Sequence, residues 1–346
     1  MLQAQLDNPD SLLRRVRGFT ASKVADGLFG NLPRLGRYIP LTRPELYGVE
    51  VERDIPYAEP GGPDWTLDVY RPAGTEGRRL PVMLYVHGGG FHALSKDTHW
   101  LMGIAFARAG YLVFNINYRL SHRHPFPAPL EDVCTAYRWV IDHAGTFGGD
   151  FNRLVLAGES AGANLVTALT VACCYPRFEP YARKVFECSH VPTAVLATCG
   201  ILQVNDMERY ARAGTAHPLE VDVMKHVSRD YVGVNPDPYA TELANPLLLL
   251  ERAKPPTRPL PPFMAAVGLS DPLLNDTLRL ERALYRLGVR CDAPTYAGEP
   301  HAFFALIWRA KAQRCWRDMF AFLDDVVPSP EEAQRLRTDR AAQGST

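Results

Sequence analysis

The 346-residue sequence carries no net charge, because 38 Lys and Arg balance 38 Asp and Glu. Without a basic excess, nothing in the composition points to nucleic acid or to an anionic membrane as a partner. The apolar stretch that comes closest to a membrane span, 191–204, is too short to cross a bilayer. The N-terminus shows no basic start followed by an apolar core, so we expect no signal peptide.

Cysteine patterns that would bind a metal are also missing. The seven cysteines are irregularly spaced, no C-x-x-C occurs, and the adjacent Cys173 and Cys174 do not have a metal-ligand spacing. We therefore expect no metal and reduced, mostly buried thiols in a cytoplasmic protein. Internal repeats are absent too.

What the sequence does contain is a regular alternation of strand and helix patterns. Alternating apolar residues at 49–55 and 65–70, joined by a Pro-Gly-Gly-Pro turn, predict an antiparallel pair at one end of a sheet. Continuously apolar stretches predict buried strands at 82–86, 111–114, 154–156, 194–197, 263–267 and 289–296. Helical patterns lie at 99–109, 130–144, 161–174, 276–287 and 303–326. The alternation predicts an α/β fold with a mostly parallel eight-stranded sheet and helices on both faces.

Two segments fall outside this alternation. The stretch 202–261 has helical pieces and a Pro-rich end but no strand pattern. Because ligands bind at the carboxyl ends of strands in such sheets, we expect it to form a cap over the site. The N-terminal segment 1–48 is predicted to pack as an amphipathic arm of this cap, a poorly ordered leader being the alternative. The predicted organisation is an arm at 1–48, a catalytic core at 49–201 and 262–327, a cap insertion at 202–261 and a polar tail at 328–346.

The motif Gly-Glu-Ser-Ala-Gly at 158–162 lies between a predicted strand and a predicted helix. The pattern G-x-S-x-G in that setting is typical of a nucleophile elbow, a tight turn that places a serine at a helix N-terminus. Glycines two residues to either side of Ser160 prevent collisions with the neighbouring strand and helix. The alternative is a serine that caps a helix after a buried strand.

A serine hydroxyl needs a general base and an orienting acid to act as a nucleophile at neutral pH. In hydrolases of this pattern the base is a histidine that follows both the serine and the acid in the chain. His301 lies in a short loop between the last predicted strand and the terminal helix, where it could reach Ser160. His217 and His226 fall in the predicted cap, so we predict that His301 is the base.

The acid is expected in the loop that leaves the strand 263–267. Asp271 lies in that loop and is our predicted third member of the triad. Asp276, five residues further on, is the alternative, although we expect it to begin the next helix as an N-terminal carboxylate.

The segment His-Gly-Gly-Gly-Phe at 87–91 follows the strand 82–86. Its glycines leave backbone N–H groups free to approach a substrate oxygen, which is typical of an oxyanion loop in lipases and esterases. We predict an oxyanion hole formed by the N–H groups of Gly89, Gly90 and Ala161, with Gly88 shaping the turn. A flexible structural turn is the alternative.

Taken in chain order, these motifs resemble the hormone-sensitive-lipase-like esterases, also called bacterial lipase family IV. The resemblance covers about residues 50–325 and rests on six segments: 87–91, Asn-Tyr-Arg-Leu at 117–120, Pro-Phe-Pro-Ala-Pro-Leu-Glu-Asp at 125–132, 158–162, Asp-Pro-Leu at 271–273 and His-Ala-Phe at 301–303. It implies an α/β-hydrolase core, a helical cap, a Ser-Asp-His triad and no cofactor. It also implies hydrolysis of esters with short to medium acyl chains, and a possible homodimer. Glu159, where many members have Asp, and Ala163, where Gly is common, are departures.

The function predicted is therefore that of a serine carboxylesterase acting on a small-molecule ester through an acyl-enzyme. Four side chains could line the acyl or alcohol pocket, although each could equally pack in the core: Phe91, Leu94, Trp100 and Phe303. Cleavage of amides or peptides by the same triad is the first alternative. A non-catalytic binder with this fold and a lipase acting at lipid interfaces are the others.

Overall fold

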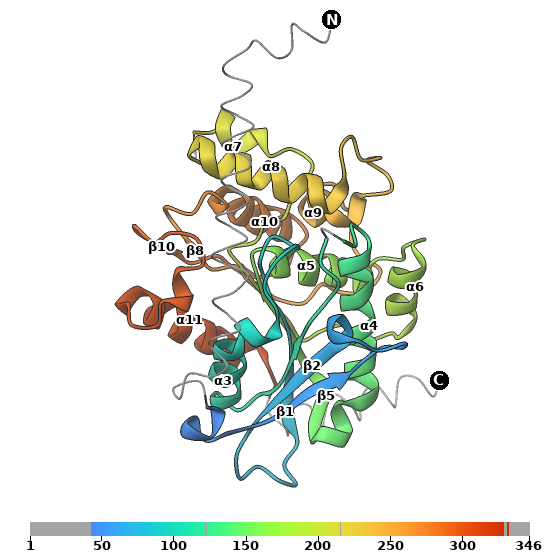
Figure 1. Ribbon diagram of the computed structural model, residues 1–346, viewed down its shortest axis with the longest axis vertical. Helices are drawn as coiled ribbons and strands as arrows, with labels where there is room; N and C mark the ends of the chain where they lie inside the picture. The colour runs from blue at the N-terminus through green and yellow to red at the C-terminus, as the bar shows by residue number, and fades with distance from the viewer. Residues whose placement is uncertain (1–42, 122, 215, 329–330, 332–346) are drawn as a thin grey trace, which may run out of the picture.

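The computed structural model describes residues 43–121, 123–214, 216–328 and 331. An eight-stranded sheet runs through its centre in the spatial order β1-β2-β4-β3-β5-β6-β7-β9 (Figure 1). The strands are β1 (Val49–Pro56), β2 (Thr66–Pro72), β3 (Leu80–Val86), β4 (Leu112–Ile116), β5 (Gly149–Glu159), β6 (Ala194–Thr198), β7 (Phe263–Met264) and β9 (Cys291–Asp292). β2 is antiparallel to both β1 and β4, and all other neighbours are parallel. The predicted α/β sheet is thus confirmed, including the antiparallel pair at one end.

The last two predicted strands are each broken in two. The stretch 263–267 contains β7 and then β8 (Val267–Gly268), and 289–296 contains β9 and then β10 (Thr295–Tyr296). β8 and β10 pair in parallel as a separate two-stranded sheet. Pro294 lies between β9 and β10, where its lack of an N–H interrupts the ladder.

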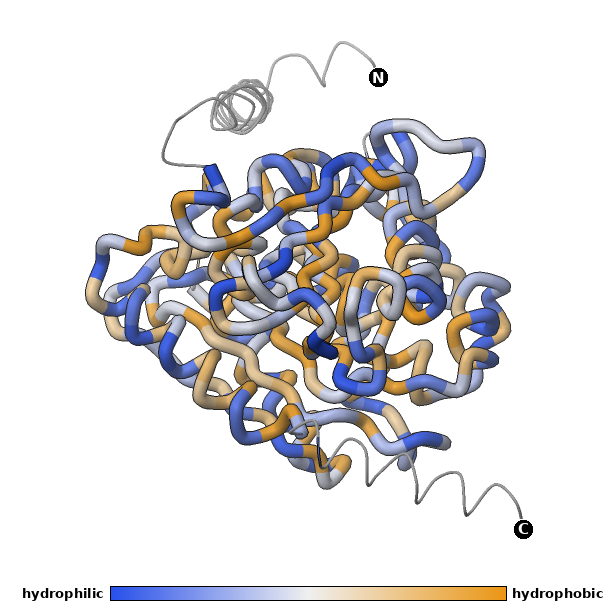
Figure 2. Tube along the Cα trace, turned by 90° about the horizontal axis from the view of Figure 1, so that it is seen from below, coloured by the Kyte–Doolittle hydropathy of each residue, from blue (hydrophilic) through white to orange (hydrophobic). Residues whose placement is uncertain are grey.

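Helices cover both faces of the sheet. They are α3 (Trp100–Arg108), α4 (Ala128–His143), α5 (Ala161–Cys174), α6 (Pro180–Glu187), α10 (Leu274–Arg286) and α11 (Ala310–Val326). Alternate residues of β3 face opposite ways: Leu84 joins the apolar cluster that contains α4 and α5, and Met83 joins the cluster that contains α3 and α11. Both faces of the strand are therefore buried, as its continuous apolar run predicts. Figure 2 shows the apolar stretches concentrated inside the molecule and many of the polar ones at its edge.

Two helix predictions need correction. α6 follows α5 without having been expected, and the predicted helix 303–326 begins only at Ala310. The residues before Ala310 contain a short 3₁₀ turn, η8 (Phe303–Ala305), whose aromatic side chains are buried. Because these side chains are buried, the residues that follow His301 form a short turn and not the first turn of the long helix.

The chain between β6 and β7 is helical and forms no strand among its described residues. It contains α7 (Glu208–Arg212), α8 (Pro218–Val232), η7 (Glu242–Ala244) and α9 (Pro246–Arg252). α7 and α8 lie along one end of the molecule, at the top of Figure 1. α9, which was not predicted, packs against α5 and α10.

The predicted arm at 1–48 lies outside the described residues except for its end. There, η3 (Pro44–Tyr47) packs against β1 and α3. The predicted tail at 328–346 is also almost wholly outside them. None of the helices in the described ranges is both long and apolar enough to cross a membrane.

Candidate active site

Ser160 is the single residue between the end of β5 and the start of α5. Its backbone has φ 54° and ψ −114°, a strained conformation for a residue with a side chain. A Cβ on Gly158 would lie 2.6 Å from the carbonyl carbon of Gly162, and one on Gly162 would lie 2.0 Å from the oxygen of Val86. The two glycines are therefore required by the close approach of β3 and α5 to this turn.

The side chains of Ser160, Asp271 and His301 meet at the carboxyl ends of their strands. His301 Nε2 lies 3.1 Å from Ser160 Oγ, and His301 Nδ1 lies 2.9 Å from Asp271 Oδ2. Asp271 is completely buried, whereas the imidazole is 37% exposed. Because the carboxylate can only accept, Nδ1 carries the proton and Nε2 is left to accept from the serine hydroxyl.

The alternatives to this trio are used elsewhere in the fold. Asp276 lies in the first turn of α10, as expected, but it is buried and forms an ion pair of 2.7 Å with Arg209 of α7. His217 caps the N-terminus of α8, and His226 pairs with Asp230 on the same helix. None of them contacts Ser160 in the hydrogen bonds of the described residues.

The pKa of His301 is set by opposing effects. Burial lowers it, while Cys199 and Asp271 raise it, and the net result is a pKa well above the ordinary histidine value. Burial raises the pKa of the Cys199 thiol itself. Cys199 is therefore uncharged near neutral pH, which leaves Asp271 as the charge that acts on the imidazole.

Cys199 was assigned no role from the sequence, yet it lies directly beside the trio. The ligand atoms of Cys199, Asp271 and His301 lie within 4.8 Å of one another, and sulfur, oxygen and nitrogen are donors that zinc accepts. Asp271 and His301 already bind each other, so a metal ion would have to displace the hydrogen bond that joins them.

The glycine-rich loop lies beside the elbow. Gly88 donates its N–H to Glu159 Oε1 at 2.6 Å, so this group is not available to a substrate. No hydrogen bond joins the N–H groups of Gly89, Gly90 or Ala161 to another residue in the described part of the chain. Gly89 has φ 102°, and a Cβ there would lie 2.2 Å from the oxygen of Ala93. Only glycine fits this position.

The four predicted pocket residues differ in their surroundings. Phe91 is fully buried and stacks on Tyr231 of α8, with ring centroids 3.7 Å apart. Phe303 is also buried and packs against Tyr296 at 5.0 Å. Leu94 and Trp100 are partly exposed. Core packing accounts for the two phenylalanines, and a pocket role for any of the four stays a prediction.

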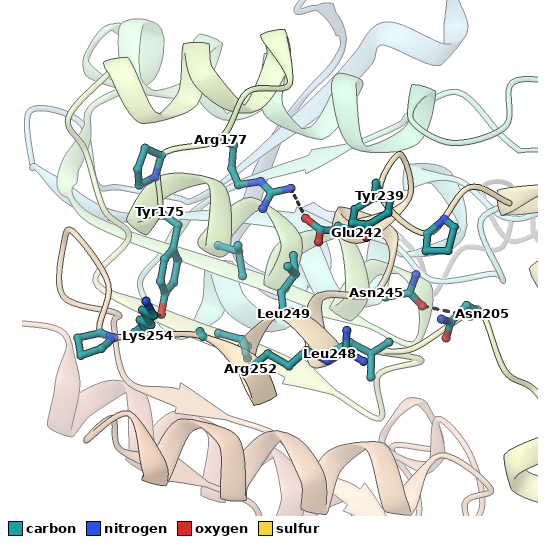
Figure 3. A pocket seen from close by; sticks show the side chains of 16 residues that line it. Tyr175, Arg177, Asn205, Tyr239, Glu242, Asn245, Leu248, Leu249, Arg252 and Lys254 are labelled. Atoms are coloured by element: carbon teal, nitrogen blue, oxygen red, sulfur yellow. Dashed lines mark hydrogen bonds and ion pairs between the residues drawn. The ribbon is translucent and has the colours of Figure 1, made fainter.

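A cavity of about 660 Å³ opens elsewhere, between the end of α5 and the segment 238–255. Figure 3 shows Tyr175, Leu248 and Leu249 among its walls. One of its lining cations, Arg177, forms an ion pair with Glu242 at 2.8 Å, drawn as a dashed line in Figure 3. This cavity is not lined by Ser160, Asp271 or His301. We therefore take the hydrogen-bonded group around Ser160, rather than the cavity, as the candidate active site.

The sheet order, the elbow and the Ser-His-Asp geometry together define an α/β hydrolase. Residues 83–305 match a family model described as an alpha/beta hydrolase fold. The chain is 31% identical to the esterase LipI of Mycobacterium tuberculosis over 248 residues, which cover 71% of each protein.

Known structures agree with this assignment. A hyperthermophilic esterase from the archaeon Pyrobaculum calidifontis superposes with a TM-score of 0.70, covers 92% of this chain and 98% of its own, and shares the fold at 23% identity. An esterase of the bacterial hormone-sensitive lipase family is 27% identical, with a TM-score of 0.63 over 81% of this chain and 86% of its own. The chain belongs to the alpha/beta hydrolase family and, within it, to the hormone-sensitive-lipase-like carboxylesterases.

Proposed function

We propose that the chain hydrolyses carboxylic esters with short to medium acyl chains, through an acyl-enzyme formed on Ser160. The observation that supports this most strongly is the continuous hydrogen-bonded line from Asp271 through His301 to Ser160 Oγ. In such a line the histidine can take the serine proton while the carboxylate stabilises the imidazolium that results.

In the first half of the proposed reaction, Ser160 Oγ attacks the ester carbonyl carbon and its proton passes to His301 Nε2. The electrons of the C=O bond move to oxygen, where the N–H groups of Gly89, Gly90 and Ala161 stabilise the charge. When the tetrahedral intermediate collapses, the alcohol leaves with the proton from His301. The acyl group stays on Ser160.

In the second half, water takes the place of the alcohol. His301 accepts a proton from the water as its oxygen attacks the acyl carbon, and the same N–H groups stabilise the second oxyanion. Collapse breaks the bond to Ser160 Oγ, which recovers its proton from His301, and releases the carboxylic acid. The enzyme returns to its starting state without a cofactor in any of these steps.

The test is hydrolysis of p-nitrophenyl esters with acyl chains of two to sixteen carbons. We expect the wild-type rate to be highest on the shorter chains, and kcat of Ser160→Ala to fall on the order of 10⁶-fold. Ser189→Ala is the matched control, because Ser189 also has a positive φ, 52°, but lies in a turn away from the site. Its activity should equal that of the wild type.

An aryl amide of the best acyl chain serves as the second substrate. Turnover of this amide without turnover of any ester would overturn the ester assignment in favour of an amidase. A peak at the longest chains would contradict the short-chain preference and leave the triad mechanism standing. Equal activities of wild type and Ser160→Ala would contradict the role of Ser160 itself.

A further inference from the structure

Glu159 ends strand β5 immediately before Ser160, and its side chain is buried. Three groups from different elements donate hydrogen bonds to its carboxylate. Gly88 N–H of the glycine-rich loop binds Oε1 at 2.6 Å, His99 Nε2 binds Oε1 at 2.7 Å, and the hydroxyl of Tyr85 binds Oε2. A buried carboxylate is stable only when it is paired in this way.

His99 lies directly before α3, and both of its ring nitrogens face acceptors. Nε2 faces the Glu159 carboxylate, and Nδ1 lies 3.0 Å from the carbonyl oxygen of Ser95. Nδ1 also lies 2.7 Å from Thr98 Oγ1, whose hydroxyl donates to the same Ser95 oxygen at 2.7 Å, so oxygen acceptors face both nitrogens and the arrangement favours the doubly protonated, cationic ring. Burial lowers the pKa of His99, but Glu159 more than offsets this and the net shift is upward. Behind the nucleophile there is therefore a buried imidazolium–carboxylate pair.

The charge on Glu159 is maintained by the same contacts. Burial raises the pKa of this carboxyl group, but His99, Tyr85 and the Gly88 N–H lower it further, to a net value below the ordinary one. A cavity lined by Glu159 and mostly apolar side chains has a volume of only about 10 Å³, at the limit of what holds one water molecule. Glu159 thus depends on protein donors, and one of these is the oxyanion loop.

The loop is also fixed in space against Glu159. A Cβ on Gly88 would lie 2.9 Å from both the carbonyl oxygen and Oε1 of Glu159, so the two backbones are in direct contact. The next two peptides carry the N–H groups of Gly89 and Gly90. Their direction follows from the plane of the Gly88 peptide, because consecutive peptide planes are linked only through φ and ψ.

We propose that Glu159, paired with His99, is a positioning residue that aims the N–H groups of Gly89 and Gly90 at the oxyanion. This inference rests on the proposed function. Glu159 does not touch the substrate in this role, and it acts through the Gly88 hydrogen bond. A carboxylate that only satisfied buried donors would affect stability and leave the oxyanion hole unchanged.

The experiment compares Glu159→Gln with Glu159→Leu. Glutamine retains an oxygen for Gly88 and His99, and its N–H can donate to the Tyr85 oxygen, whereas leucine removes every acceptor at similar size. Against the best p-nitrophenyl ester, we expect kcat of Glu159→Leu to fall about 10²–10³-fold, the effect of losing one oxyanion donor, with KM nearly unchanged. Glu159→Gln should lose no more than about tenfold.

A trifluoromethyl ketone with the same acyl chain provides the readout specific to the hole. Ser160 Oγ adds to its carbonyl carbon, the proton passes to His301, and the resulting alkoxide occupies the oxyanion hole. We expect the affinity of Glu159→Leu for this ketone to fall by the same factor as kcat. Asp150→Asn is the matched control, since Asp150 is a buried carboxylate at the opposite end of β5 and should leave both values unchanged.

Each outcome decides the proposal. A folded Glu159→Leu with kcat and ketone affinity within threefold of wild type would overturn it, as would a loss confined to KM or an equal loss in Asp150→Asn. If Glu159→Leu does not fold, His99→Gln against His99→Leu poses the same question, with loss expected only for leucine. Failure of the proposed function is recognised separately, because wild type itself would then show no Ser160-dependent ester hydrolysis.

Discussion

The imidazole of His301 has a buried charge on one side and solvent on the other, and in the proposed mechanism this arrangement controls when the ring can act as the base. Only the neutral ring can accept the proton of Ser160. Burial lowers the pKa of His301, but the net shift is upward from the ordinary value of 6.5, and Asp271 is the charged group beside the ring that favours its protonated form. The ring therefore becomes protonated at a higher pH during acidification than an isolated histidine would.

The first prediction concerns the acid limb of the pH profile. We expect kcat/KM of the wild type to fall as the pH drops, with a midpoint above 6.5, because kcat/KM reports the free enzyme's base. The measurement is the initial rate on one ester at constant ionic strength from pH 4 to pH 10. A flat profile down to pH 4, or a midpoint below 6.5, would contradict the role of His301 as base.

A substitution at Asp271 tests the source of the shift. Asp271→Asn removes the charge, so kcat should fall on the order of 10⁴-fold, as for an orienting acid that has lost its carboxylate. The pKa of His301, followed by NMR of the ring protons, should move downward in this variant. Asp237→Asn, an exposed aspartate in the loop after α8, is the control in which neither quantity changes.

At the scale of elements, helix α8 packs directly against the glycine-rich loop, residues 87–91, that lies beside Ser160. Tyr231 of α8 stacks on Phe91, its backbone oxygen accepts from Phe126 N–H at 2.7 Å, and a Cβ on Gly90 would lie 2.9 Å from Val227. The loop that contains the predicted oxyanion donors is therefore packed beneath a helix from outside the strand alternation.

We predict that the aromatic ring of Tyr231, rather than its hydroxyl, maintains this contact. Tyr231→Ala should lower the free energy of unfolding by about 3–5 kcal/mol, the cost of removing a large buried ring, and should reduce kcat/KM as Phe91 loses its support. The hydroxyl is buried without a hydrogen-bond partner in the described structure, so Tyr231→Phe should be neutral or slightly stabilising. Urea unfolding and ester kinetics measure both. Equal losses in the two variants would contradict the prediction.

A second link between elements joins α7 to α10 through a buried ion pair. Asp276 is completely buried, pairs with Arg209, and accepts the N–H of Leu202 at 2.9 Å. Asp276→Ala should cost about 3–5 kcal/mol in urea unfolding, because it leaves a buried cation without its partner. Arg212 of the same helix pairs with Asp206 at the exposed surface, so Arg212→Ala should cost less than about 1 kcal/mol. Similar losses of unfolding free energy in the two variants would show that burial does not determine how much each ion pair contributes to stability.

At the scale of the whole molecule, stability comes from packing on both faces of the sheet without covalent cross-links. All seven cysteines are free thiols, and five of them are buried. We predict that the thermal unfolding midpoint is the same with and without a thiol reductant, since no disulfide constrains the unfolded chain. Differential scanning calorimetry in both conditions measures this. A lower midpoint with reductant would reveal a disulfide.

The parts of the molecule that could be predicted from the sequence are those in which the signal is local. Continuous apolar runs gave the central strands, and the turn chemistry around Ser160 and Gly89 fixed where the elbow and the loop begin. Helix α9 was missed because its four consecutive leucines, 247–250, have no helical period and lie near prolines. The predicted helix 303–326 was too long because buried aromatic packing, rather than helix propensity, determines its first turn.

The same distinction between local signals and contacts of distant elements applies to the residues of the site. That Ser160, Asp271 and His301 lie together could be predicted, because their order and their positions after strands follow from the fold. The pairing of Glu159 with His99 could not, because the two residues meet only when β5 and the start of α3 are brought together by β3. Neither residue lies in a spacing that indicates an ion pair.

Under the proposed mechanism, the distance along the chain between Ser160 and His301 has a consequence for when the protein becomes active during synthesis. Ser160 and His301 are 141 residues apart, and the histidine follows the last strand. A growing chain that has already formed the elbow still lacks its base until the final part of the fold is made. With synthesis at about 5–20 residues per second, the nucleophile is complete on the order of ten seconds before it can react. The ribosome-bound chain should therefore be unable to attack esters during that interval.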